Sequence, residues 1–359
     1  MKYSVPCLTI LLLCCLFFSG QTQHTDYGSI SGFIYDAETG SGIEAANVYI
    51  SNTTFGDATD ANGKYIIPAV PPGLHELVVS VIGYEPQTKF INVIKSSRLT
   101  FSFKLKPKIY ESEAIEVIAA NQKIWFRDLE TFQKLFLGSS PLVKECFIRN
   151  ETVLKFDWPW ETRLKASASE PLIIVNSGLG FRISCVMIDF TWDKVQEQWS
   201  WIIKPHFEEL EPESEKEQQK YDKNRMDAYS GSLNHFLLSL INDKLFENGY
   251  EIYISEKASY KTDPLEQYPA NDQIVIKEGL VPGERIIEFE HYLKVVNFKK
   301  FMSYNPARYQ TSWLHLRQGK VTLDRYGYAR DFQPFEVYGY WATLGVADLL
   351  PRYYFTENH

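Results

Sequence analysis

The sequence has few cysteines, no surplus of basic residues and no apolar run long enough to cross a membrane as a helix. Its 359 residues include five Cys, and 37 Lys and Arg stand against 45 Asp and Glu, which gives a net charge of −8. A general nucleic-acid binder needs a basic face to neutralise phosphates, so the composition argues against that class. Hydrophobic residues make up 45% of the chain, which excludes extensive disorder. The length favours two domains.

The first 20 residues have the layout of a cleaved signal peptide. Lys2 supplies a positive charge, Leu8–Phe18 is almost continuously apolar, and small residues follow up to Gly20. The apolar run is shorter than the roughly 20 residues that a membrane-spanning helix needs, so a permanent anchor is the less favoured alternative. We expect cleavage after Gly20, export to the periplasm or the outer membrane, and no transmembrane helix in the mature chain.

Removal of residues 1–20 would leave two cysteines, Cys146 and Cys185, and 36 basic against 45 acidic residues, a net charge of −9. In an oxidising compartment the two cysteines could form one disulfide, although a single pair is a weak framework. The alternative is a pair of buried free thiols, because cysteine behaves as a small hydrophobic residue. The sequence leaves both alternatives open.

Residues 28–107 consist of short strand-like segments separated by turn residues. Ser29–Asp36 alternates apolar and polar residues, as a half-buried strand does. The pair Asn62-Gly63 lies between two apolar segments and tolerates positive φ, which predicts a tight hairpin turn. Strands this short at such regular spacing predict an all-β sandwich. The further strands are expected at 46–50, 64–67, 74–81, 90–93 and 99–105.

The same stretch carries five short motifs in a fixed order, namely Gly32–Asp36, Ala46–Val48, Thr59–Tyr65, Pro72-Gly73 and Ile82–Tyr84. In this order they resemble the carboxypeptidase-regulatory-like domain, a transthyretin-like β-sandwich. The resemblance implies a module without catalytic residues, of the kind that opens many Gram-negative envelope proteins. The acidic residues near the predicted turn fail the spacing of a calcium-binding loop, so no metal site is expected there.

Residues 108–120 are expected to be a linker, and residues 121–359 an α+β domain with an antiparallel sheet. Part of this region, including 228–237 and Gly339-Tyr340-Trp341, resembles an uncharacterised extension that follows the same sandwich in other bacterial envelope proteins, and the resemblance implies no activity. Helices are predicted at 121–138, at 213–227, from the N-cap Ser232 to Gly249, and at 340–350. Strands are predicted at 153–156, 162–168, 171–175, 180–190, 199–206, 251–255, 274–277, 285–294, 312–316 and 320–324.

No residues are assigned to catalysis, to a metal or to a cofactor. His206 and Glu209 have the short spacing of a zinc peptidase pair, but such a match arises by chance and no His-Glu-x-x-His occurs. His235 lies among apolar residues, which favours a histidine satisfied within the core. The alternative is a hydrolase site in 121–359, where His235, Arg225, Tyr229 and a carboxylate would converge.

The function that the sequence favours is that of an exported, non-catalytic envelope protein, acting in binding or assembly. Its partner would be another envelope protein or a glycan. A hydrolase is the first alternative and a glycan-binding protein the second. The surplus of tryptophan and tyrosine is the only hint of glycan binding, and it requires two or more aromatic side chains exposed on one flat face. Most aromatic residues have core-like spacing, but Trp158 and Trp160 are left unexplained.

Overall fold

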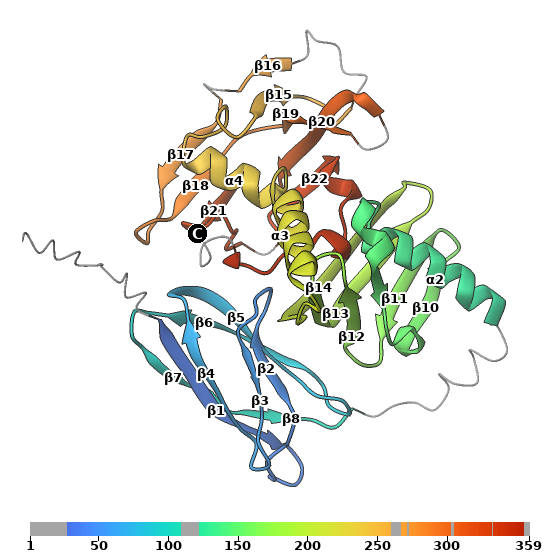
Figure 1. Ribbon diagram of the computed structural model, residues 1–359, viewed down its shortest axis with the longest axis vertical. Helices are drawn as coiled ribbons and strands as arrows, with labels where there is room; N and C mark the ends of the chain where they lie inside the picture. The colour runs from blue at the N-terminus through green and yellow to red at the C-terminus, as the bar shows by residue number, and fades with distance from the viewer. Residues whose placement is uncertain are drawn as a thin grey trace, which may run out of the picture.

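The computed structural model describes residues 27–108, 122–259, 267–270, 273–302, 305–331 and 333–354 (Figure 1). The expected signal peptide and nearly all of the expected linker lie outside these ranges. Within them, no helix is long and apolar enough to cross a membrane.

The N-terminal domain is the predicted β-sandwich. Its two sheets enclose one core that includes Ile34, Val48 and Leu77. The predicted strand at 99–105 is divided in two, and both halves run parallel to the first strand. One sheet has the order β4-β1-β7, with β8 also beside β1, and the other has the order β3-β2-β5-β6. The strands are β1 (Gly28–Asp36), β2 (Asn47–Ile50), β3 (Gly56–Ala58), β4 (Lys64–Val70), β5 (Gly73–Ser80), β6 (Gln87–Val93), β7 (Arg98–Thr100) and β8 (Phe103–Leu105).

The Asn62-Gly63 turn is tight, as predicted, but it does not join two paired strands. Gly63 has a φ of +78°, and the Asp60 carboxylate accepts hydrogen bonds from the backbone N–H groups of Asn62 and Lys64. Strand β3 pairs with β2, whereas β4 pairs with β1 in the opposite sheet. The hairpin prediction was therefore wrong, because the chain crosses between the two sheets at this turn.

The first half of the second region is a helix on an antiparallel sheet. Helix α2 (Gln122–Leu137) places Phe132 and Phe136 in a core that the sheet completes. The sheet has the order β10-β11-β13-β12-β9, and β14 lies along β13. Its members are β9 (Cys146–Ile148), β10 (Leu154–Trp160), β11 (Arg163–Ala168), β12 (Leu172–Asn176), β13 (Phe181–Asp193) and β14 (Gln198–Glu209), with the 3-10 helices η1 (Pro141–Glu145) and η2 (Glu151–Val153) between them.

The second half has a separate core around Phe236, Leu293 and Leu314. The second region is thus α+β with antiparallel sheets, as predicted, but it has two cores. The main sheet has the order β16-β15-β19-β20-β22, and a small sheet has the order β17-β18-β21. The elements are α3 (Glu215–Tyr229), α4 (Leu233–Ile241), β15 (Tyr250–Ser255), β16 (Gln267–Pro269), β17 (Val275–Glu278), β18 (Arg285–Glu288), β19 (Tyr292–Met302), β20 (Asn305–Leu316), β21 (Lys320–Leu323) and β22 (Phe335–Gly339).

Two helix predictions were wrong. Helix α4 ends at Ile241 rather than at Gly249, because Asn242 caps it and Asp243 turns the chain with a φ of +55°. The closing helix expected at 340–350 is replaced by the 3-10 helices η4 (Trp341–Thr343) and η5 (Val346–Asp348), separated by an extended Gly345. This C-terminal segment, red in Figure 1, joins the orange sheet to the green half.

Candidate functional site

The sandwich is docked onto the outer edge of β14. The turn after β2 runs along this edge, where the Asn52 N–H donates to the Pro205 carbonyl at 2.7 Å and the Phe207 N–H donates to the Thr53 carbonyl at 3.0 Å. Thr53 and His206 form a parallel bridge there. The contact between the two domains is therefore a short β-ladder.

Side chains reinforce the ladder. The Tyr49 ring stacks on His206 with ring centroids 4.9 Å apart, and the Tyr49 hydroxyl donates to the Lys204 carbonyl at 2.9 Å. Lys204 Nζ lies 2.7 Å from a carboxylate oxygen of Glu76, and both side chains are largely buried. Burial lowers the pKa of His206, which favours the neutral ring. These contacts hold the sandwich against the second region as one packed unit.

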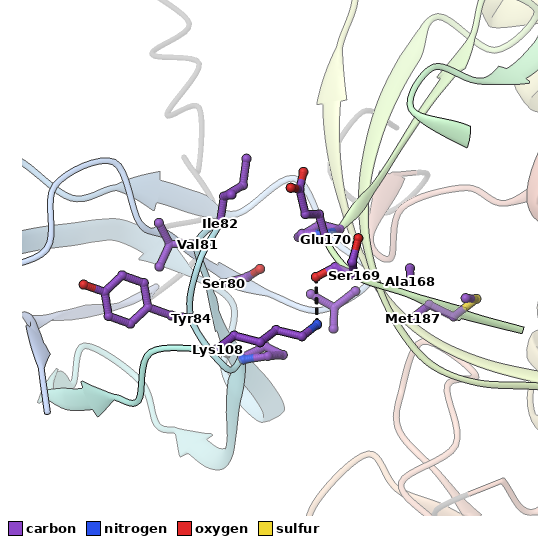
Figure 2. A pocket seen from close by; sticks show the side chains of 12 residues that line it. Ser80, Val81, Ile82, Tyr84, Lys108, Ala168, Ser169, Glu170 and Met187 are labelled. Carbon is purple, nitrogen blue, oxygen red and sulfur yellow. Dashed lines mark hydrogen bonds between the residues drawn. The ribbon is translucent and has the colours of Figure 1, made fainter. Parts of the chain in front are cut away.

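A small hollow lies at a second contact between the domains (Figure 2). Lys108 Nζ donates to the Ser169 carbonyl at 2.7 Å across it. Tyr84 and Ile82 lie on the sandwich side, and Met187 lies on the other. Its volume of about 60 Å³ is far below that of a ligand pocket. The hollow is a joint between domains rather than a binding site.

A much larger hollow is a groove of about 690 Å³ between the β13–β14 hairpin and β22. This volume is in the range of small-molecule and peptide sites. Among the described residues, both flanking strands lie at the edge of their sheets, because β13 is the only strand paired with β14 and β20 is the only strand paired with β22. The groove is lined by aromatic residues and by charged or amide residues, which are Trp199, Trp201, Phe335, Tyr338 and Trp341, and Arg163, Asp193, Gln196, Glu197, Gln198, Arg317, Gln333 and Glu336.

The charged groups of the groove are paired loosely. An Arg163 guanidinium nitrogen lies 3.4 Å from the Asp193 carboxylate. Glu336 lies 3.4 Å from both Arg317 and His315. Partly exposed pairs at such distances contribute little stability, so a ligand can compete for either partner. The groove thus offers donors and acceptors beside its aromatic walls.

The floor of the groove is fixed to the rest of the second region. The Trp341 indole N–H donates to the Gly231 carbonyl at 2.8 Å. The Ser139 N–H donates to the Thr343 carbonyl at 2.9 Å, directly after helix α2. Gly138 and Gly345 approach so closely that a Cβ at Gly138 would lie 2.5 Å from the Gly345 nitrogen. The floor of the groove is therefore held by backbone contacts and by the buried Trp341 indole.

His235, near the start of α4, has hydrogen-bond partners for its ring within the fold. Its Nδ1 lies 2.8 Å from the Tyr250 hydroxyl and accepts the Gly231 N–H at 3.3 Å. Burial, with smaller contributions from the charges of Lys300 and Lys299, lowers the pKa of His235 to about 4, so the ring is neutral at pH 7. The Ser232 hydroxyl accepts the His235 N–H at 3.1 Å, which confirms the predicted N-cap.

The residues of the hydrolase alternative do not assemble into a shared site. Tyr229 packs edge-on against His235, with ring centroids 5.0 Å apart. Arg225 is buried elsewhere, where it donates to the Leu179 carbonyl at 2.7 Å and to the Tyr354 hydroxyl at 2.8 Å. None of the three candidate residues lines the groove.

His206 and Glu209 do not form a metal pair. Residues three apart on a strand point to opposite faces, and His206 faces Tyr49 while Glu209 lies 3.3 Å from Arg225. Across the ranges that the structure describes, no group of three or more His, Cys, Asp or Glu side chains is placed to hold a metal.

Cys146 and Cys185 are both buried free thiols. Strand β12 lies between their strands, where Cys146 is opposite Asn176 and Cys185 is opposite Leu172. Two strand spacings amount to about 10 Å, beyond the Cα separation of about 7 Å that a disulfide tolerates. The bridge considered from the sequence is therefore absent from this fold. Burial raises the pKa of Cys146 to about 12.

Trp158 and Trp160, which the sequence left unexplained, lie at the end of strand β10 in the sheet of the second region's first half. Trp160 is 58% exposed, with the Arg163 guanidinium 5.0 Å from its ring centroid. Trp158 donates its indole N–H to Asp128 at 3.0 Å and meets Trp192 edge-on. Trp158 and Trp192 pack edge to face, so the two rings do not form the flat exposed platform that a glycan-binding face requires.

Comparisons with known proteins identify the first domain. The family model of the CarboxypepD_reg-like domain matches residues 30–117, so this part of the chain belongs to that family, as its motifs predicted. The match covers about a quarter of the chain. No curated protein matches the sequence.

Solved structures give only weak likenesses. A cohesin–X-dockerin complex of Acetivibrio cellulolyticus is 23% identical, with 21% of this chain and 51% of that chain covered and a TM-score of 0.17. The chain thus spans about half the length of that relative. The 5-hydroxyisourate hydrolase of Klebsiella pneumoniae is 19% identical over 23% of this chain and 94% of that chain, with a TM-score of 0.20. A DUF3823 family protein of Parabacteroides merdae is 9% identical over 50% of this chain and 80% of that chain, with a TM-score of 0.17. Likenesses this weak carry no argument about function.

Proposed function

We propose that the chain is an exported envelope protein that binds a partner, and that the groove between β14 and β22 is its binding surface. The observation that carries the proposal is the groove itself, a hollow of about 690 Å³ where aromatic and charged side chains converge. Most ligand sites are concave and combine apolar walls with a few polar groups. Export rests on the N-terminal sequence, whose layout is that of a signal peptide.

A binding role fits the state of the side chains better than hydrolysis does. The groups that a hydrolase would use are engaged in structural contacts, because His235 bonds Tyr250 and Arg225 bonds buried carbonyl groups. The docked sandwich also supports a binding role. It pairs with part of the β14 edge and leaves the rest of that edge to the groove. In this proposal the sandwich is a structural module and the second region recognises the partner.

The walls of the groove also favour a second candidate, a glycan ligand. Trp199, Trp201 and Tyr338 line the groove beside Arg163 and Gln198. Aromatic rings next to hydrogen-bonding side chains can hold a sugar ring by its apolar face and its hydroxyls. This candidate uses the same surface and differs only in the chemistry of the ligand.

Substitution in the groove tests the proposed function. The protein from residue 21 onward is screened against an oligosaccharide array and a pool of extended heptapeptides, and the affinity of the tightest ligand is measured by calorimetry. We expect Trp199→Ala and Tyr338→Ala each to weaken binding about tenfold or more, because truncating a central aromatic contact removes much of the binding energy.

The matched control is Phe246→Ala, because Phe246 is a strongly exposed aromatic residue outside the groove. The affinity of this variant for the selected ligand should stay within about twofold of that of the unchanged protein. The proposal would be overturned if no ligand bound, or if the groove variants bound as tightly as the control.

A further inference from the structure

We propose that the groove takes an extended polypeptide segment, which inserts as a strand between the free edges of β14 and β22. The inference rests on the proposed function and names the ligand class of the same site. The inference follows from the directions in which backbone N–H and C=O groups point on β14 and β22, which are far apart in the sequence. On each strand, the hydrogen bonds of neighbouring residues show which N–H and C=O groups point into the groove.

The outward groups of β14 follow from its contact with the sandwich. The Pro205 carbonyl and the Phe207 N–H point away from β13, because they bond Asn52 and Thr53. Backbone direction alternates along a strand, so the N–H and C=O groups of Trp199 and Trp201 also point outward. Both residues line the groove. Among the described residues, no hydrogen bond reaches these outward groups.

The outward groups of β22 follow in the same way. The Pro334 carbonyl accepts the Arg317 N–H, and the Tyr340 N–H donates to the Thr311 carbonyl. The backbone groups of the even-numbered residues of β22 therefore point toward β20. The intervening odd-numbered residues, Phe335 and Val337, therefore present their N–H and C=O groups to the groove. Within the described ranges, nothing pairs with this edge of β22.

The protein already uses the β14 edge in the way that we propose. The sandwich segment at Thr53 pairs with β14 through two backbone hydrogen bonds and a parallel bridge. Pro205 lacks an N–H and lies in this paired part, as edge prolines do. The open part, at Trp199 and Trp201, continues the same edge. A polypeptide in the groove would extend an interface that exists within the molecule.

Two strand edges along one groove favour a polypeptide over a glycan. An extended backbone presents N–H and C=O groups alternately to its two sides, so one strand can satisfy both edges when they lie about 10 Å apart. Sugar hydroxyls have no such repeat. The side chain of Trp201 packs against one core, and that of Val337 packs against the other. Their neighbours Ser200 and Glu336 point to the opposite faces of the two strands, because side chains alternate along a strand. The inserted segment should therefore alternate apolar and polar residues.

Backbone methylation of the ligand tests the insertion. The probes are fluorescein-labelled heptapeptides in which Val, Ile, Phe or Tyr alternates with Ser, Thr or Gln, and the tightest member is resynthesised with one N-methyl group at each central amide in turn. Because alternate amides face opposite edges, we expect every central methylation to weaken binding about tenfold. Weakening at alternate amides only would mean pairing with a single edge, and no weakening would mean contact through side chains. Either result overturns the inference.

A substitution in β22 tests the same point from the protein side. Val337→Pro removes one outward N–H without removing a bond to β20, and edge strands tolerate proline. We expect it to weaken peptide binding about tenfold, whereas Val337→Thr, which keeps the N–H, stays within about twofold. Equal affinity of the two variants would overturn the inference. If oligosaccharides bind the groove and no peptide does, the inference fails while the proposed function stands; if neither binds, both fail.

Discussion

Gly138→Ala is expected to lower the free energy of unfolding by about 3 kcal/mol or more. Gly138 follows helix α2 with a φ of +91°, where any residue with a Cβ is strained. The added Cβ would also lie 2.5 Å from the Gly345 nitrogen and 3.0 Å from its Cα. Backbone cannot rotate aside as a flexible side chain does, so the C-terminal segment would have to move away from α2. The measurement is urea unfolding followed by tryptophan fluorescence.

Gly83→Ala is the matched control for this prediction. Gly83 has a φ of +89°, and a Cβ there would meet nothing within 4 Å. Its substitution carries the conformational strain without the clash, so we expect a loss of only about 1 kcal/mol. Equal losses for the two variants would show that the contact between Gly138 and Gly345 does not constrain the fold. That result would also remove the reason for a fixed groove floor, since Leu344 lines the groove and bridges Gly138.

Arg225→Ala is expected to be the second large effect, with a loss of about 3 to 5 kcal/mol in the free energy of unfolding. The guanidinium is buried and donates to the carbonyl groups of Leu179 and Gly180, and it lies 4.1 Å from the centroid of the Phe181 ring. It also bonds Tyr354, which ties the C-terminal segment to α3. Truncation would leave these acceptors buried without a donor and would open a cavity beneath the helix.

Lys223→Ala is the control for Arg225, because it lies on the same helix and its ion pair with Asp227 is exposed. Exposed pairs contribute little, so we expect a change below about 0.5 kcal/mol. Urea midpoints of both variants measure the difference. A loss below about 1 kcal/mol for Arg225→Ala would contradict the view that this side chain fixes α3 to the loop before β13 and to the C-terminal segment.

The sandwich could be predicted from the sequence because its signals are local. Alternation in Ser29–Asp36 placed β1, and turn residues such as Pro72-Gly73 marked the strand ends. What could not be predicted is which sheet each strand joins. Asn62-Gly63 looks like a hairpin turn in one dimension, but the partners of β3 and β4 lie elsewhere in the chain. Sheet membership depends on packing between distant segments, which a turn motif does not encode.

The groove was the least predictable feature. Its two edges are more than 120 positions apart in the chain, and no local pattern marks the space between two sheets. Strand β22 itself had a signal, because Phe335-Glu336-Val337-Tyr338 alternates between apolar and polar residues after Pro334. The closing helix was wrongly predicted at 340–350 because the close approach of Gly345 to Gly138, a contact across about 200 residues, interrupts it. Tertiary contact overrides local propensity at this point.

The most direct test of the account is amide hydrogen exchange of the protein with and without the selected ligand bound. We expect bound ligand to slow exchange at residues 199–203 and 335–339 together, the two edges that flank the groove. The exposed strand β17, Val275–Glu278, should exchange at the same rate in both states. Protection confined to the sandwich or to β17, with no change at either groove edge while the ligand is bound, would contradict the central claim that the groove is the binding surface.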